Sequence, residues 1–88
     1  MTRYRVVTHR RARRELESCP AWLHDRVEEL VEALAYGPKP KGFEVIELQG
    51  DKGIFRTRFG DYRVVYIVES DTLIKIIRVS PRGDAYSD

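Results

Sequence analysis

Apolar residues recur every three or four positions between residues 12 and 34, a spacing that predicts two consecutive helices. The first is short, with Thr8 as a candidate N-cap and a narrow apolar stripe made of Ala12, Leu16 and Cys19. The second suits a start near Pro20 and a stop at Gly37-Pro38. Its wider stripe consists of Leu23, Val27, Leu30, Val31 and Leu34. Together they predict a helical hairpin with one apolar side.

Segments rich in β-branched and aromatic residues lie on both sides of these helices and predict strands. One precedes them at Arg3–Thr8 (RYRVVT), and a loop at Lys39–Gly42 follows them. Residues 43–50 (FEVIELQG) enter the sheet or lead to it. Three strands then follow at residues 54–59 (IFRTRF), 62–68 (YRVVYIV) and 73–79 (LIKIIRV). The order β-α-α-β-β-β predicts an α+β fold, in which the helical hairpin packs on one face of an antiparallel sheet.

Gly60-Asp61 predicts the register of the first hairpin in this sheet. Glycine at the first position of a two-residue loop suits a type II′ turn, which pairs Phe59 with Tyr62. Because side chains alternate between the two faces of a strand, one face then receives a set of mostly apolar residues. These are Phe55, Thr57, Phe59, Tyr62, Val64 and Tyr66. This face is expected to receive the apolar side of the helices.

Three arginines fall on the opposite face of the same hairpin. The register places Arg58 directly opposite Arg63, with Arg56 two residues along. Without an anion, such an arrangement repels by a few tenths of a kcal/mol to about 1 kcal/mol. Guanidinium groups bind phosphate through two parallel hydrogen bonds, so the cluster suits a phosphodiester whose charge rises in a transition state.

Further cations and a tyrosine are expected at the same end of the sheet. A two-residue turn at Ser70-Asp71 would place Arg78 beside Arg63, where Arg78 is a candidate for binding RNA. The final segment SPRGDAY would bring Arg82 and Tyr86 to the same place. The alternative is that these arginines only solubilise an exposed face, some of them paired with the acidic residues Asp61, Glu69 or Asp84. A terminal tyrosine also packs against a sheet edge without any chemical role.

Length and composition limit the other possibilities. The 88 residues, 42% of them hydrophobic, suffice for one domain spanning residues 1–88. No apolar run reaches the length of a membrane span, and the start lacks a secretory signal, so we expect a cytoplasmic protein that does not bind membranes. The single Cys19 has no disulfide or metal-site partner, and we expect neither a metal nor a cofactor.

A second basic segment, HRRARR, covers His9 to Arg14. Its density makes Arg10 and Arg13 candidates for contact with RNA phosphates, against the alternative of a solvated helix face. His9 and His24 titrate in the right range for acid–base catalysis, but both belong to the helical side of the fold. We therefore interpret them as surface or capping residues.

The chain resembles the RelE toxins of the RelE/ParE superfamily over nearly its whole length. The resemblance is carried by the order of elements, by LQGDKGIFRTRFGDYRVVYIV and by IIRVSPRGDAY. It implies a toxin–antitoxin endoribonuclease that cleaves mRNA in the ribosomal A site, where the ribonucleotide 2′-OH attacks its own 3′-phosphate. It also implies a cognate antitoxin that wraps the toxin in a hetero-oligomer. By motif position, the catalytic set comprises Arg56, Arg58, Arg63, Arg82 and Tyr86.

The sequence departs from this pattern at the general base. RelE members often carry lysines at the first two places, whereas Arg56 and Arg58 stay protonated and cannot accept a proton. Tyr86 could orient or stack on a base, or act as a phenolate at a cost near pH 7. A ParE-like toxin that inhibits DNA gyrase by protein–protein contact on the same fold is the alternative function.

Overall fold

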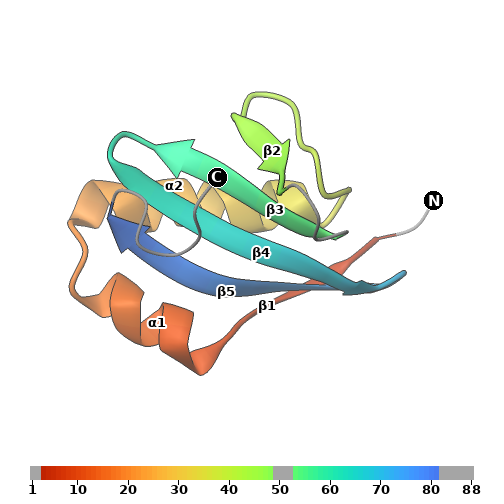
Figure 1. Ribbon diagram of the computed structural model, residues 1–88, viewed down its shortest axis with the longest axis horizontal. Helices are drawn as coiled ribbons and strands as arrows, with labels where there is room; N and C mark the ends of the chain where they lie inside the picture. The colour runs from red at the N-terminus through yellow and green to blue at the C-terminus, as the bar shows by residue number, and fades with distance from the viewer. Residues whose placement is uncertain (1–2, 49–52, 82–88) are drawn as a thin grey trace.

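The computed structural model describes residues 3–48 and 53–81, which form two helices and five strands (Figure 1). In chain order these are β1 (Arg5–Thr8), α1 (Arg10–Glu17), α2 (Ala21–Leu34), β2 (Val45–Glu47), β3 (Ile54–Phe59), β4 (Tyr62–Ser70) and β5 (Leu73–Pro81). The α+β class is confirmed, and the order of elements agrees with the predicted β-α-α-β-β-β apart from one additional strand after the helices. The segment that was expected to enter or lead to the sheet supplies the short strand β2.

The strands form one sheet in the order β1-β5-β4-β3-β2. Neighbouring strands from β2 to β5 are antiparallel, as expected. The edge strand β1 runs parallel to β5, with Arg5 opposite Leu73 and Thr8 opposite Ile76, so the sheet is mixed. No turn joins β1 to β5, and the hairpin geometry that makes consecutive strands antiparallel therefore does not apply to this pair.

Each helix begins with a different cap. His9, and not Thr8 as predicted, is the N-cap of α1, because its Nδ1 accepts the backbone N–H of Arg11 at 3.0 Å. The interpretation of His9 as a capping residue is thus confirmed. Pro20 precedes α2 as its N-cap and makes no side-chain bond. Neither helix in the described part of the chain is long and apolar enough to cross a membrane.

The core lies between α2 and the sheet face that the register predicted to be apolar. In Figure 1, α2 runs behind the sheet, and α1 lies below it, beside β5. Leu23, Leu30 and Leu34 of α2 are fully buried, as are Val64 and Tyr66 of β4. Burial raises the pKa of the Tyr66 phenol, whose hydroxyl donates to the carbonyl of Pro38. Helix α2 therefore packs on the apolar face of the sheet, opposite to the face that carries Arg56, Arg58 and Arg63.

Candidate active site

The turn of the β3–β4 hairpin fixes the position of the arginines. Gly60 has a φ of +62°, a conformation that glycine adopts without a steric penalty. The strands pair with Phe59 opposite Tyr62 and Arg58 opposite Arg63, which confirms the predicted register. Arg56 pairs with Val65 and shares the face of Arg58 and Arg63. The hairpin therefore gathers three guanidinium groups on the face away from α2.

The three arginines differ in their exposure to solvent. Arg58 is exposed, Arg63 is half-buried and Arg56 is only 8% exposed. The pKa of Arg56 is lowered mainly by burial, then by repulsion from Arg63 and Arg58, while Glu44 partly offsets the effect. Both causes disfavour positive charge at this point. A bound phosphate would relieve them, because it supplies the opposite charge and bidentate hydrogen-bond acceptors.

Arg78 lies on this face, but two residues away from its predicted place. The turn between β4 and β5 pairs Ser70 with Leu73, and register shifts follow between Val68 and Ser70 and between Val65 and Tyr66. Ser80 therefore stands opposite Arg63, and Arg78 stands opposite Val65. The predicted pairing of Arg78 with Arg63 is wrong for this reason. Arg78 is instead a diagonal neighbour of Arg63.

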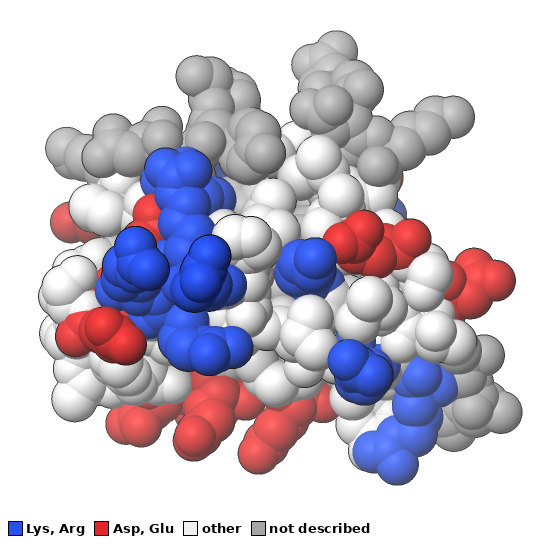
Figure 2. All heavy atoms as spheres, turned by 90° about the horizontal axis from the view of Figure 1, so that it is seen from below, with Lys and Arg blue, Asp and Glu red and all other residues white. Residues whose placement is uncertain are grey.

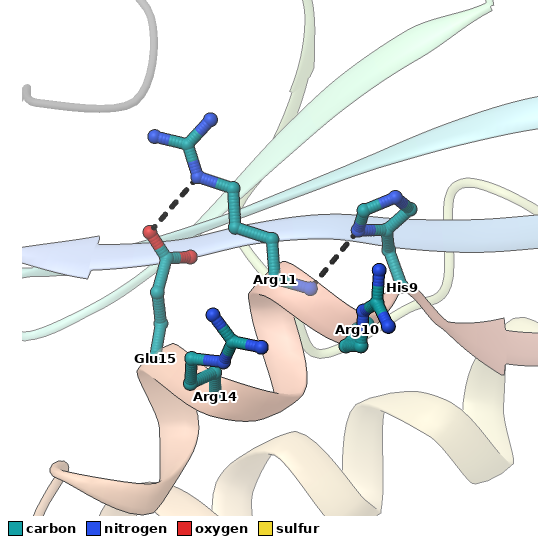
Figure 3. A pocket seen from close by; sticks show the side chains of 5 residues that line it. All are labelled: His9, Arg10, Arg11, Arg14 and Glu15. Carbon is teal, nitrogen blue, oxygen red and sulfur yellow. Dashed lines mark hydrogen bonds and ion pairs between the residues drawn. The ribbon is translucent and has the colours of Figure 1, made fainter.

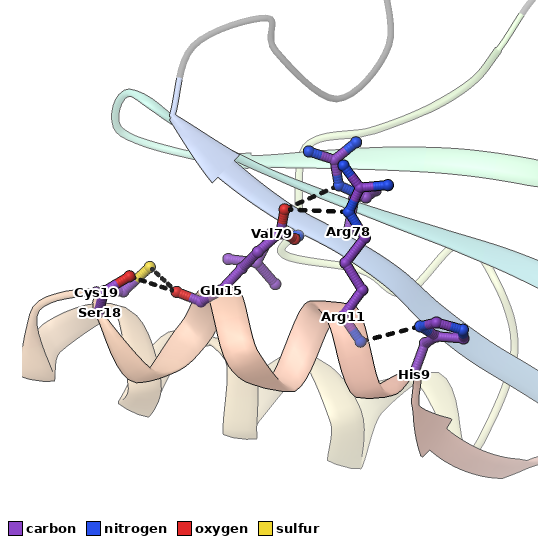
Figure 4. Close-up of polar contacts among 7 residues, drawn as sticks. All are labelled: His9, Arg11, Glu15, Ser18, Cys19, Arg78 and Val79. Atoms are coloured by element: carbon purple, nitrogen blue, oxygen red, sulfur yellow. Dashed lines mark hydrogen bonds and ion pairs between the residues drawn. The ribbon is translucent and has the colours of Figure 1, made fainter.

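Glu15 of α1, which the sequence did not single out, binds the sheet next to this cluster (Figure 4). Its Oε2 accepts the Nε–H of Arg78 at 3.0 Å, and its Oε1 accepts the backbone N–H of Val79 at 2.8 Å. The Nε of Arg11 lies 3.8 Å from the same Oε2. One carboxylate thus joins a helix arginine to a sheet arginine. The partners are 63 and 64 positions apart in the sequence, so no local pattern could reveal the contact.

The basic segment of α1 forms a separate cationic surface. Lys and Arg side chains gather over the side of the molecule that α1 occupies, with acidic groups along one margin (Figure 2). A cavity of about 530 Å³ there is lined by His9, Arg10, Arg11, Arg14 and Glu15 (Figure 3). Arg10 is exposed at this cavity, whereas Arg13 donates to the carbonyl of Thr8 at 3.3 Å. Of the two RNA contacts predicted on α1, only Arg10 lines the cavity.

Three predicted or considered residues remain, namely Arg82, Tyr86 and His24. Arg82 and Tyr86 lie outside the described residues, so their place in the site stays a prediction. His24 is exposed on α2, the helix that packs on the other face of the sheet. Trp22 of α2 is half-exposed and packs edge-to-face against Tyr62, with the ring centroids 5.9 Å apart. The cluster that the structure does describe is therefore built from the arginines of β3, β4 and β5.

Comparison with known proteins places the whole chain in one family. Residues 6–86 match the model of the ParE toxin of the type II toxin–antitoxin system parDE. A candidate toxin of Methanocaldococcus jannaschii, RelE1, is 35% identical over 88 residues, which cover 98% of each chain. In the crystal structure of the archaeal RelE–RelB complex from Pyrococcus horikoshii OT3, the matching chain is 42% identical. The match covers 97% of this chain and 100% of that one, with a TM-score of 0.79.

More distant structures share the same fold. The Mycobacterium tuberculosis toxin–antitoxin complex RelBE2 contains a chain that is 29% identical, with a TM-score of 0.70 and coverage of 96% of this chain and 97% of that one. Isolated RelE of E. coli is 16% identical, with a TM-score of 0.73 and coverage of 90% and 84%, and shows the fold alone. The chain therefore belongs to the ParE toxin family of type II toxin–antitoxin systems and is a RelE-type toxin.

Proposed function

We propose that this toxin is a ribosome-dependent mRNA endoribonuclease that cleaves in the A site. The observation that carries the proposal is the pairing of Arg58 with Arg63 on the sheet face away from α2, with Arg56 and Arg78 beside them. Directly opposed like charges destabilise a sheet, so a fold that keeps them is expected to gain from an anionic ligand. A phosphodiester has the charge and the planar pairs of acceptors that guanidinium groups bind.

The proposed reaction needs stabilisation of charge more than any other contribution. The 2′-oxygen attacks the adjacent phosphorus after losing its proton, the bond from phosphorus to the 5′-oxygen of the next nucleotide breaks, and that oxygen takes up a proton. The products are a 2′,3′-cyclic phosphate and a free 5′-hydroxyl. Arg56, Arg58 and Arg63 would stabilise the extra negative charge of the five-coordinate phosphorus. Arg82 and Tyr86 are added to this catalytic set by the family resemblance.

We propose dependence on the ribosome because the arginines of the cluster cannot act as a general base. A guanidinium group only donates hydrogen bonds and has no acceptor for the 2′-proton. Charge stabilisation alone leaves a slow enzyme, and the ribosome supplies the missing rate by holding the RNA in the reactive geometry. The exposed Arg10 on the cationic side of α1 suits contact with ribosomal RNA phosphates, and Arg13 lies on the same helix.

A cognate antitoxin is the second proposed partner. The Pyrococcus and Mycobacterium relatives were crystallised as toxin–antitoxin complexes. We propose that an antitoxin segment carrying Asp or Glu binds along the helical hairpin or the sheet edge of this chain and covers the arginine cluster in a hetero-oligomer. A cytoplasmic location, where translating ribosomes are found, completes the proposal.

Cleavage of mRNA on purified, programmed ribosomes tests the activity. The wild-type toxin should cut mRNA positioned in the A site and should cut the same RNA poorly without ribosomes. Arg63→Gln should slow the cut by at least about tenfold, the effect of roughly 1.4 kcal/mol of lost transition-state stabilisation. Lys75→Gln is the matched control, because Lys75 is on the same face at the far end of β5 and pairs with Glu69.

Three results would contradict the proposal. Efficient cleavage of free RNA at low toxin concentration would remove the dependence on ribosomes. Absence of cleavage on ribosomes, combined with inhibition in a gyrase supercoiling assay, would favour the ParE-like alternative. Arg63→Gln cutting as fast as Lys75→Gln would separate the activity from the arginine cluster.

A further inference from the structure

Glu15 binds the last part of β5, where one edge of this strand has no neighbouring strand in the described sheet. β1 pairs with β5 only as far as Ile76, while β5 continues to Pro81. In the described sheet, the edge of β5 beyond Ile76 has no neighbouring strand on the side of β1. The Oε1 of Glu15 takes the place of a strand there, because it accepts the N–H of Val79. The carboxylate thereby fixes the last part of β5 against α1.

The same carboxylate also orients Arg78. Glu15 binds this side chain through Nε alone, and among the described residues no hydrogen bond is made by the two terminal amino groups of Arg78. A guanidinium held at Nε has limited freedom to rotate, and its terminal amino groups remain available as a fork for phosphate. The side chain of Arg78 is 17% exposed, so an ordered contact replaces a freely moving surface charge.

Glu15 does not cancel the positive charge around it. Arg11 and Arg78 both approach its Oε2, so two guanidinium groups share one carboxylate and one unit of positive charge remains. Arg78 is in turn the diagonal neighbour of Arg63 across the β4–β5 ladder. The contact therefore keeps an arginine at the border of the cluster without making that border neutral.

We propose that Glu15 is a positioning residue for RNA cleavage, which acts by holding Arg78 and the end of β5 beside Arg63. The inference rests on the proposed ribonuclease activity and goes further, because it assigns a role to a helix residue and a contribution to Arg78. Arg78 contacts the RNA backbone next to the scissile phosphate, and Glu15 contacts no RNA. Loss of Glu15 should accordingly lower the cleavage rate only through Arg78.

A double-mutant cycle on ribosomes tests this dependence. Glu15→Gln keeps an oxygen that can accept the Val79 N–H but loses the second acceptor and the charge that hold Arg78. We expect Glu15→Gln and Arg78→Ala each to lower the maximal cleavage rate about tenfold. The double variant should be no slower than Arg78→Ala alone. Glu17→Gln removes the same charge from an exposed position of α1 and should cleave at the wild-type rate.

Structural damage is separated from positioning by two further measurements. Thermal unfolding identifies variants that have lost stability, and all rates are compared well below the lowest melting temperature. The Nε–H signal of Arg78 in a ¹⁵N NMR spectrum should exchange slowly with water in the wild type and quickly in Glu15→Gln, as expected for a lost hydrogen bond.

The outcomes distinguish the two proposals. A wild-type toxin that does not cut on ribosomes overturns the proposed function, and the role of Glu15 falls with it. A wild type that cuts, together with a double variant about a hundredfold slower than wild type, shows two independent effects and overturns only the role of Glu15. Glu15→Gln cleaving at the wild-type rate overturns it as well.

Discussion

Replacing Arg58 by glutamine should make the toxin more stable while it destroys activity. Arg58 is exposed, faces Arg63 directly across the hairpin and lies two residues from Arg56 on the same strand. We take the charge separations to equal the usual spacings of sheet positions, about 5.5 Å for opposite residues and about 7 Å for residues two apart on one strand. In a high dielectric, charges at these distances repel by about 0.75 and 0.6 kcal/mol. Screening in 0.1 M salt, where the Debye length is about 10 Å, leaves about 0.7 kcal/mol in total. Glutamine removes this repulsion and keeps a side chain of similar length.

Thermal unfolding gives the readout for this prediction. For a domain of 88 residues, about 0.7 kcal/mol corresponds to a rise of the melting temperature of roughly 3–6 °C. In 1 M salt the Debye length falls to about 3 Å, and the gain should shrink to about 0.2 kcal/mol. Lys41→Gln, a change of equal charge in the exposed loop before β2, is the control for net charge and should show no such gain.

The result that would refute the reasoning is equally specific. A melting temperature of Arg58→Gln at or below that of Lys41→Gln in 0.1 M salt would show that the two arginines do not repel in the folded protein. A gain that stays the same in 1 M salt would show that the effect is not electrostatic. In either case the cluster would lose its physical argument as an anion site.

Three other residues give independent checks of the structure. His9→Ala should cost about 1 kcal/mol of stability, measured by urea unfolding, because it removes the N-cap of α1. Tyr66→Phe should cost about 1 kcal/mol by leaving the carbonyl of Pro38 without its donor. Because its pKa is raised in the folded state, Tyr66 contributes stability that is complete below about pH 10 and is lost above it, which absorbance at 295 nm can follow. The pKa of the Cys19 thiol is raised by burial and by Glu15, so iodoacetamide should react with it more slowly at pH 8 in the folded protein than in urea.

Local signals in the sequence were sufficient for the hairpin and the helices. Gly60 marks the turn of the β3–β4 hairpin, and side chains alternate between the two faces of each strand on both sides of it. These two facts determine which residues lie opposite each other, so the opposition of Arg58 and Arg63 could be predicted. The apolar stripe of α2 likewise predicts which face of the helix is buried, because apolar residues at helical spacing must pack against the core. Each of these features depends on residues that are close in the sequence.

Features that depend on distant residues could not be predicted. The turn between β4 and β5 falls at Asp71-Thr72 and not at Ser70-Asp71, which moves Arg78 opposite Val65. The two register shifts in the same strand pair compensate each other, and no residue type marks their positions in the sequence. The parallel pairing of β1 with β5 and the contact of Glu15 with Arg78 both join parts of the chain that only the folded structure brings together. Their direction and geometry follow from packing and not from a turn.

The pairing of β1 with β5 also determines when the toxin can complete its fold. Arg5 pairs with Leu73, so the strand that leaves the ribosome first among the described elements must wait for the strand that leaves last. The β3–β4 hairpin closes through a two-residue turn, and its paired residues lie between 3 positions (Phe59 and Tyr62) and 13 positions (Ile54 and Ile67) apart in the sequence. Contacts of such different sequence separation form on different timescales, because closing a long loop costs more entropy than closing a short one. During synthesis, the arginine-bearing hairpin can therefore form while β1 still lacks its neighbour in the sheet.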